Sequence, residues 1–166
     1  MSGVSELFLS LDYLYLAAPD VGAAVRFYTE ALGGTLVWRV RDGGSVVAAV
    51  RLTGSGPLVL LADHLDRGAG LLIYRVRSLA ELRESLTGLG WTTEGEPFEI
   101  PQGPCVVLRD PGGQRLAAYE RVRPGMDARF EGRFDPADAP SRRAARSGAR
   151  ASAAGRAGAA EWGGRS

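Results

Sequence analysis

The sequence predicts an α+β fold, in which two βαβββ modules in tandem form a curled mixed sheet around a cleft. Two observations predict it. The chain reads strand, turn and helix twice, first as LDYLYLAAPDVGAAVRFYTEAL and then as LLIYRVRSLAELRESLTGL. Each copy is followed by three short runs of strand-forming residues, separated by glycine-rich turns. Because one helix cannot cover the sheet of its module, we expect the two copies to curl around a shared cleft.

The first module is expected over residues 8–64. Apolar residues alternate over residues 9–17, which predicts a strand. Asp20 is a candidate N-cap of the helix that follows, and the glycine pair that begins at Gly33 is a stop signal. Hairpin turn signals separate three further strands, which are expected at residues 35–41, 45–52 and 57–62.

The second module is expected over residues 70–122. Ser78, with Glu81 three residues later, forms a capping-box pattern for a helix that runs to Leu89. A DPGG sequence near the end is the clearest tight turn in the chain. The strands of this module are expected at residues 71–76, 91–100, 104–109 and 114–121. Together, the two modules are expected to make one domain over residues 8–122.

The composition changes at about residue 126. Residues 126–166 are rich in Ala, Gly, Ser and Arg and contain few large apolar side chains. Such a segment cannot bury enough surface to offset its ordering entropy, so we expect a disordered tail. Its 8 arginines against 5 acidic residues leave a contact with an anionic partner open. A solvated terminus is the commoner case.

Composition excludes several classes of function. The chain has no lysine, so Schiff-base chemistry on a lysine is impossible. Its single cysteine cannot form an internal disulfide and fits a cytoplasmic location. Residues 1–125 hold 12 arginines and 14 acidic residues, which argues against nucleic-acid binding by the folded domain. No apolar run reaches the roughly 18–20 residues that span a bilayer, so no membrane partner is expected.

Three stretches, in this order, resemble the vicinal oxygen chelate superfamily. They are DVGAAVRFYTEALG from Asp20, the helix over residues 78–90, and DPGGQRLAAYE from Asp110. The superfamily includes glyoxalases, bleomycin-resistance proteins and extradiol dioxygenases. The resemblance covers about residues 8–122 and implies the fold predicted above. It also implies a site in the cleft and a homodimer.

The metal-ligand positions that this resemblance implies are degenerate. Members commonly carry His, His and Glu at the positions of Tyr13, Leu71 and Ala117, and the remaining ligand falls on or near Val59. Leucine, alanine and valine have no donor atoms, and a lone tyrosine phenolate would not hold an ion. We therefore expect no metal and no other cofactor, although the fold prediction is unaffected.

Aromatic, apolar and arginine side chains are expected on the concave face by strand alternation. Flat rings with a few polar tips suit a planar or amphipathic small molecule, and arginines suit a carboxylate or phosphate. Alternatively, these side chains only fill the cleft or form a dimer seam, and a one-residue error in phase would exchange the faces. The candidate ligand-binding residues are Tyr13, Tyr15, Trp38, Val59, Leu71, Ile73, Arg75, Arg115, Ala117 and Tyr119.

Two other residues have chemistry of their own. His64 follows the fourth strand and is either an acid–base or metal-binding residue or a solvated loop histidine. Its acidic neighbours favour the loop interpretation. Cys105 lies in the apolar strand PCVVL and is expected to be a buried core thiol, because no basic setting that would activate a nucleophile is visible.

Three functions remain open. We favour a metal-free protein, similar to the bleomycin-resistance branch, that binds a small aromatic or amphipathic molecule in the cleft between the modules. The alternative is a divergent enzyme of the superfamily, a lyase, isomerase or dioxygenase, with an unconventional site built from Tyr13, Tyr15, Tyr119 or Glu120. The third is an interaction module that uses the arginine-rich tail.

Overall fold

The structure is a computed structural model that describes residues 7–136. The disorder expected for residues 137–166 lies outside the described residues. The first module consists of β1 (Phe8–Ala17), α1 (Val21–Arg26), the π-helical turn η2 (Phe27–Ala31), β2 (Thr35–Asp42), β3 (Ser45–Arg51) and β4 (Leu58–Ala62). The second consists of β5 (Gly70–Val76), α2 (Leu79–Leu86), β6 (Thr92–Ile100), β7 (Gly103–Arg109) and β8 (Arg115–Glu120). The helix α3 (Met126–Phe130) follows.

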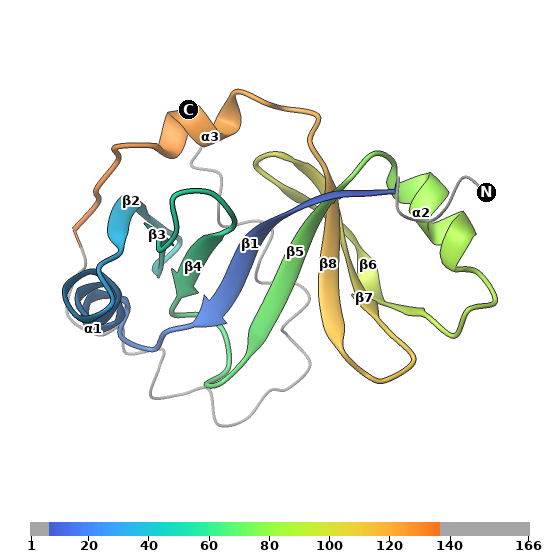
Figure 1. Ribbon diagram of the computed structural model, residues 1–166, viewed down its shortest axis with the longest axis horizontal. Helices are drawn as coiled ribbons and strands as arrows, with labels where there is room; N and C mark the ends of the chain where they lie inside the picture. Colours follow the sequence, from blue (N-terminus) through green and yellow to red (C-terminus); the bar gives the residue numbers. More distant parts are fainter. Residues whose placement is uncertain (1–6, 137–166) are drawn as a thin grey trace.

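Within the described range, the strands form one mixed sheet in the order β2-β3-β4-β1-β5-β8-β7-β6. In each module the first and last strands pair in parallel, β1 with β4 and β5 with β8. The antiparallel pair β1–β5 joins the modules within one chain. Figure 1 shows β1, β5 and β8 in front, with the outer strands curling behind them. The predicted α+β fold of two βαβββ modules is therefore confirmed.

The two main helices begin where the sequence predicts. The side chain of Asp20 accepts a hydrogen bond from the backbone nitrogen of Ala23 at 2.8 Å, and that of Ser78 accepts one from Glu81 at 3.2 Å. Gly33, with φ of 72°, follows the end of the first helical segment. The helices lie at opposite ends of the sheet (Figure 1). None of the helices within residues 7–136 is long and apolar enough to cross a membrane.

Each face of the sheet has its own core. On the convex face, one apolar cluster contains Val21 and Val25 of α1 and a second contains Leu82 and Leu86 of α2. The concave face holds a third cluster, which draws on both modules. Its larger members are Tyr13, Tyr15, Trp38, Leu60, Ile73, Ile100, Tyr119 and Phe130.

Part of the segment expected to be disordered is ordered. Residues 122–136, which we call the strap, run from the end of β8 to the outer edge of β2 and include α3 (Figure 1). Phe130 is buried in the concave cluster. At the edge, Arg39 donates its N–H to the carbonyl of Arg133 at 2.8 Å, and Asp135 donates to the carbonyl of Arg39 at 2.9 Å. The average composition of residues 126–166 conceals this single aromatic anchor.

Candidate functional site

The concave cluster leaves two spaces open, an apolar cavity at one end and a charged groove at the other. Tyr15 and Ile73 lie toward the cavity, and Tyr13 and Arg75 lie toward the groove. Alternate residues of a strand share a face, so these pairs are successive concave positions of β1 and β5. The two spaces therefore lie along the same strands of one face.

The apolar cavity encloses about 80 Å³ between the central strands and the β6–β7 hairpin. Asp66 and Arg115 are the charged residues of its lining. The Nε of Arg115 donates to Glu94 at 2.8 Å, and the two terminal amino groups make no hydrogen bond within residues 7–136. The apolar residues that line the cavity include Leu71, Ile73, Phe98, Ile100, Cys105, Val107 and Ala117.

A tyrosine–histidine pair lies at this cavity. Tyr15 lines it, and the Tyr15 hydroxyl lies 2.6 Å from Nε2 of His64. His64 follows β4 and is half-buried. The sequence favoured a solvated loop histidine; the structure instead fixes its ring against a cavity residue. The pair places an acid–base residue one side chain away from the cavity.

The Cys105 thiol forms part of the cavity wall and is 1% exposed. Burial raises its pKa to about 12, so the thiol is protonated at neutral pH. The expectation of a buried core thiol is confirmed.

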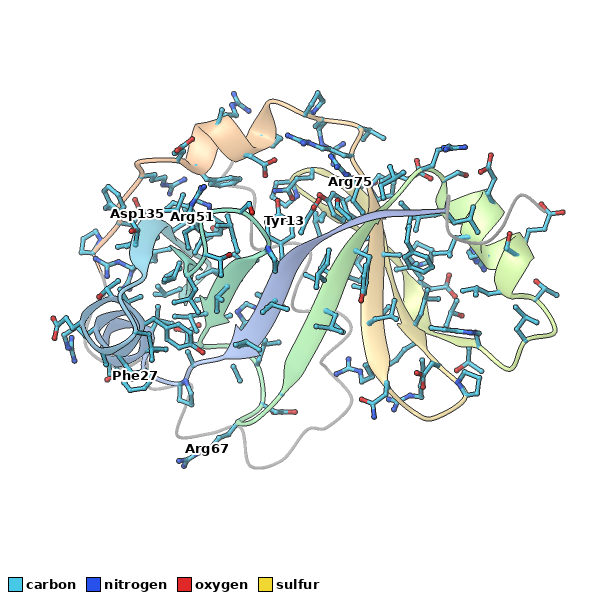
Figure 2. All side chains as sticks on the ribbon, in the orientation of Figure 1. Tyr13, Phe27, Arg51, Arg67, Arg75 and Asp135 are labelled. Atoms are coloured by element: carbon cyan, nitrogen blue, oxygen red, sulfur yellow. The ribbon has the colours of Figure 1, made fainter. Side chains whose placement is uncertain are left out.

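The charged groove has a volume of about 270 Å³. Strands β3, β5 and β8 run in the same direction, because β3 is antiparallel to β4 and β5 is antiparallel to β1. The concave row of each ends on an arginine that lines the groove, namely Arg51, Arg75 and Arg121. Figure 2 shows Arg51 and Arg75 on either side of Tyr13.

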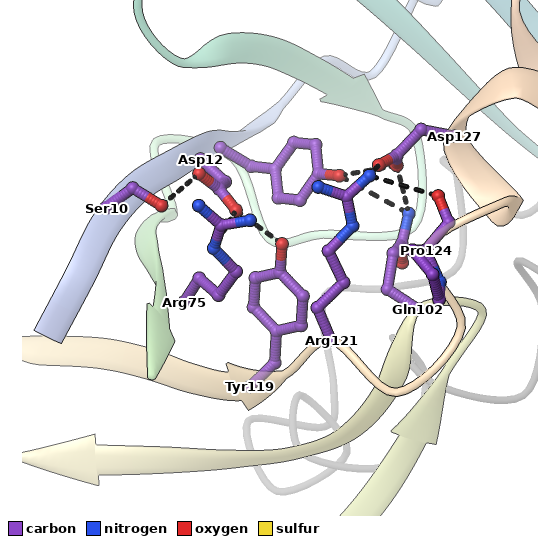
Figure 3. A network of polar contacts seen from close by, with 9 residues as sticks. Ser10, Asp12, Arg75, Gln102, Tyr119, Arg121, Pro124 and Asp127 are labelled. Carbon is purple, nitrogen blue, oxygen red and sulfur yellow. Dashed lines mark hydrogen bonds and ion pairs between the residues drawn. The ribbon is translucent and has the colours of Figure 1, made fainter. Parts of the chain in front are cut away.

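Two carboxylates neutralise part of this arginine cluster (Figure 3). Asp12 lies 3.7 Å from Arg75, and Asp127 of the strap lies 3.0 Å from Arg121. Arg51 has no ion pair or hydrogen bond with any residue of the described range. Glu131 also lines the groove, so the lining carries three guanidinium groups and three carboxylates, and Arg51 is the guanidinium without an ion pair among residues 7–136.

The predicted site residues divide between the two spaces. The cavity is lined by Tyr15, Leu71, Ile73, Arg115 and Ala117. The groove is lined by Tyr13, Trp38 and Arg75. Tyr119 is buried in the concave cluster, where its hydroxyl donates to Asp12 at 2.5 Å.

Val59 lies on the other face. It packs in the cluster beneath α1, whereas Leu60 faces the concave cluster and pairs with Tyr15. The predicted alternation of β4 is wrong by one residue, because the sequence does not fix the length of the glycine-rich turn that precedes the strand. The sequence prediction therefore names the wrong neighbour in this strand.

Sequence reasoning also missed the outer wall of the cavity. Phe98 and Ile100 of β6, with Cys105 and Val107 of β7, supply it. The alternation of Cys105 and Val107 places them on one face, but the pairing of β7 with β8 decides which face that is. The strap residue Asp127 was missed as well, because its segment was assigned to the tail.

The residues at the implied metal-ligand positions do not fit a metal. Pairing places Leu60 beside Tyr15 and Ala117 beside Ile73, so the internal repeat matches Leu60 with Ala117. With Tyr13 and Leu71, these positions offer one phenol oxygen and no other donor. Within residues 7–136, no group of three or more His, Cys, Asp or Glu side chains is placed to hold an ion. Metal sites need several converging donors.

Comparison with solved structures gives the same fold. A methylmalonyl-CoA epimerase from Mycobacterium tuberculosis is similar at 21% identity, with 75% of this chain and 95% of that chain covered and a TM-score of 0.59. A hypothetical protein from Bacillus halodurans C-125 is 18% identical over 69% of this chain and 95% of its own, with a TM-score of 0.56. A Streptomyces coelicolor methylmalonyl-CoA epimerase variant bound to 2-nitronate-propionyl-CoA is 16% identical, with coverages of 70% and 96% and a TM-score of 0.55.

No curated protein matches the chain. A family model does: residues 10–118 match the Glyoxalase/Bleomycin resistance protein/Dioxygenase superfamily. The match spans both modules, from β1 to β8. The repeated βαβββ topology, the parallel pairing inside each module and this match agree, and the chain belongs to the Glyoxalase/Bleomycin resistance protein/Dioxygenase superfamily.

Proposed function

We propose that the protein binds a small aromatic or amphipathic molecule in the apolar cavity, without a metal. One observation carries the proposal. Leu71 and Ala117 stand at positions where members of the family commonly carry metal ligands, and both are apolar parts of the cavity wall. In members with a metal, these positions would hold the ion that polarises a substrate. In this chain they form an apolar wall that excludes water.

The cavity limits the size of the ligand. A dry cavity of about 150 Å³ is known to accept benzene, and this one encloses about 80 Å³. A short alkyl chain therefore fits inside as the cavity stands, whereas an aromatic ring enters only with a rearrangement of the wall. The rest of the ligand would lie outside, where the terminal amino groups of Arg115 suit a carboxylate or phosphate.

Two adjacent leucines provide a matched test. Leu71 lines the cavity, whereas Leu72 is 41% exposed and points the opposite way from β5. We expect small phenols and short-chain carboxylates to bind the wild-type protein with 1:1 stoichiometry in titration calorimetry. Leu71→Trp should weaken this binding at least tenfold, and Leu72→Trp should leave it unchanged. A panel without any binder, or equal losses in both variants, would contradict the proposal.

A divergent enzyme is the second candidate, and the Tyr15–His64 pair is the observation that favours it. Glu120 is not available, because its carboxylate accepts the N–H of Leu79 at 2.6 Å, at the start of α2. The fold likeness makes methylmalonyl-CoA the first compound to test, by deuterium incorporation from heavy water. Binding without catalysis predicts no incorporation; incorporation that His64→Gln abolishes would establish the enzyme instead.

We also propose a cytoplasmic homodimer, in which the family resemblance supports the dimer and the single cysteine supports the location. Sedimentation equilibrium should then give twice the chain mass of 17.6 kDa. The protein without residues 137–166 should still have twice the mass of its own shortened chain, and its ligand affinity should be unchanged. A loss of either would favour the interaction module that the arginine-rich tail suggests.

A further inference from the structure

The strap holds a carboxylate and an aromatic ring against the concave face, where the carboxylate contacts both modules. Oδ1 of Asp127 accepts hydrogen bonds from the Tyr13 hydroxyl and from Nε2 of Gln102, both at 2.9 Å. Oδ2 of the same carboxylate lies 3.0 Å from Arg121 (Figure 3). Three donors on both oxygens are the arrangement that recognises a carboxylate.

None of these donors belongs to α3 itself. Tyr13 lies in β1 and Gln102 in the β6–β7 turn, while Arg121 follows β8. The turn is held close to β8, since a side-chain carbon at Gly103 would lie 2.1 Å from the carbonyl oxygen of Glu120. The sheet therefore builds the donor set, and the strap supplies only the acceptor.

The Tyr13 hydroxyl and the Gln102 amide nitrogen both act as hydrogen-bond donors toward the position of the Asp127 carboxylate. Burial, above all, raises the pKa of Tyr13, so its hydroxyl stays protonated and donates. Gln102 is 1% exposed, and its amide must turn the nitrogen toward Asp127. This orientation leaves Oε1 buried without a hydrogen-bond partner among the described residues. Such a group is costly to bury and calls for an explanation.

The aromatic part of the strap lies close by. The ring of Phe130 packs on Trp38, with centroids 5.5 Å apart and an angle of 39° between the planes. Trp38 and Tyr13 both line the charged groove. Asp127 lines the groove, and the ring of Phe130 is buried against Trp38, one of the residues of the groove wall.

We propose that the charged groove, extended by the space that the strap fills beside Trp38, is a binding site for an aromatic carboxylate, and that Asp127 and Phe130 of the strap hold the positions of its carboxylate and ring in cis. The ligand's carboxylate would replace Asp127 on Tyr13, Gln102 and Arg121, and its ring would replace Phe130 on Trp38. Arg51, which has no ion pair within residues 7–136, adds a further attraction for the anion. The site is separate from the apolar cavity and does not depend on its function.

The strap can be displaced because α3 has only five residues and would not persist on its own. The strap competes with the ligand, so the apparent affinity equals the affinity of the free groove multiplied by the fraction of molecules in which the groove is free. Weakening the internal carboxylate should therefore strengthen ligand binding. Asp127→Asn does this without creating a void, because the two side chains have nearly the same volume.

Phenylacetate is the probe, and its neutral analogue phenylacetamide is the matched control ligand. In titration calorimetry of the full chain, we expect weak phenylacetate binding to wild type and at least tenfold tighter binding to Asp127→Asn. Arg129→Gln, an exposed position of the same helix, should behave as wild type. Phenylacetamide should bind at least tenfold more weakly than phenylacetate to each protein.

Hydrogen exchange provides a readout that needs no variant. Phenylacetate should accelerate exchange at the backbone amides of residues 130–135 in the wild-type protein, because the strap leaves the edge of β2. An unchanged affinity in Asp127→Asn, equal binding of acid and amide, or unchanged exchange under saturation would overturn the proposal. Loss of phenylacetate binding in Leu71→Trp would also overturn it, because the ligand would then lie in the cavity.

Discussion

The Tyr119 hydroxyl donates to Oδ2 of Asp12 at 2.5 Å and links β8 to β1 across β5. Asp12 precedes Tyr13, yet both side chains reach groups of the concave face. A register shift between Leu11 and Tyr13 in the pairing with β5 allows this, because it breaks the strict alternation of β1. Ser10 also donates to Asp12, at 2.6 Å. The carboxylate is thus fixed beside the charged groove (Figure 3).

Tyr119→Phe should lower the free energy of unfolding by about 1.5–3 kcal/mol, the usual contribution of a hydrogen bond to a charged group. Urea denaturation followed by circular dichroism measures this. Tyr74→Phe is the matched control, because the Tyr74 ring packs on Phe8 and its hydroxyl makes no hydrogen bond within residues 7–136. The control should change stability by less than about 0.5 kcal/mol. Equal effects of the two substitutions would show that the Asp12 contact adds nothing.

Alkaline pH should destabilise the protein through its two buried tyrosines. Burial is the largest cause that raises the pKa of Tyr13 and of Tyr119 above the ordinary value of 10.0. A raised pKa in the folded state stabilises the fold below pH 10, and this contribution is lost as the pH rises from 10 through the folded values. The free energy of unfolding should fall by up to about 2.7 kcal/mol per pH unit from these two groups.

Denaturant midpoints between pH 9 and 11.5 test this, compared with a Tyr13→Phe/Tyr119→Phe variant. The variant should lose less stability per pH unit, although Cys105 titrates over the same range in both proteins. Phenolate absorbance at 295 nm offers a second check. If all five tyrosines ionise while the native circular dichroism persists, the explanation is wrong.

The sequence predicts those parts of the site that lie at a fixed count from a recognisable cap or turn. Tyr13 precedes the Asp20 cap by seven residues, and Ala117 follows the turn at Asp110 by seven, and both face the concave cluster. Val59 has no such anchor, and its phase is one residue off. Counting works where a cap or a tight turn fixes the register, because side chains alternate strictly from that point.

Other parts depend on contacts that no local pattern encodes. A bulge turns Asp12 toward the groove, and periodicity does not predict bulges. The strap is ordered because Phe130 packs on Trp38, which lies 92 residues earlier in the chain. A polar, alanine-rich composition describes the average of that segment and not its one anchor. Tertiary contacts, which the local sequence does not encode, therefore set the orientation of Asp12 and the order of the strap.

Cys105 should be nearly unreactive in the native protein. Its pKa of about 12 compares with 9.0 for an ordinary thiol, so the thiolate fraction at pH 8 is about a thousandfold lower. Labelling with N-ethylmaleimide, followed by intact mass, should be slow in buffer and fast in urea. A ligand of the apolar cavity should slow it further, because the thiol lines that space. Native labelling as fast as in urea would mean that the cavity wall opens freely.

Chelation should leave ligand binding unchanged. Tyr13, Leu60, Leu71 and Ala117 supply one phenol oxygen between them, and a divalent ion needs several converging donors. We expect less than about 0.1 equivalent of Mn, Fe, Ni or Zn per chain after growth with these metals, measured by elemental mass spectrometry. Dialysis against EDTA should change neither the melting temperature nor the affinity for a cavity ligand.

Near-stoichiometric metal that EDTA removes, together with a fall in melting temperature, would require donors from a second chain or from residues beyond 136. In that case Tyr13→Phe should remove the metal if its phenolate is a ligand, and it should leave the metal content unchanged if the ion lies elsewhere.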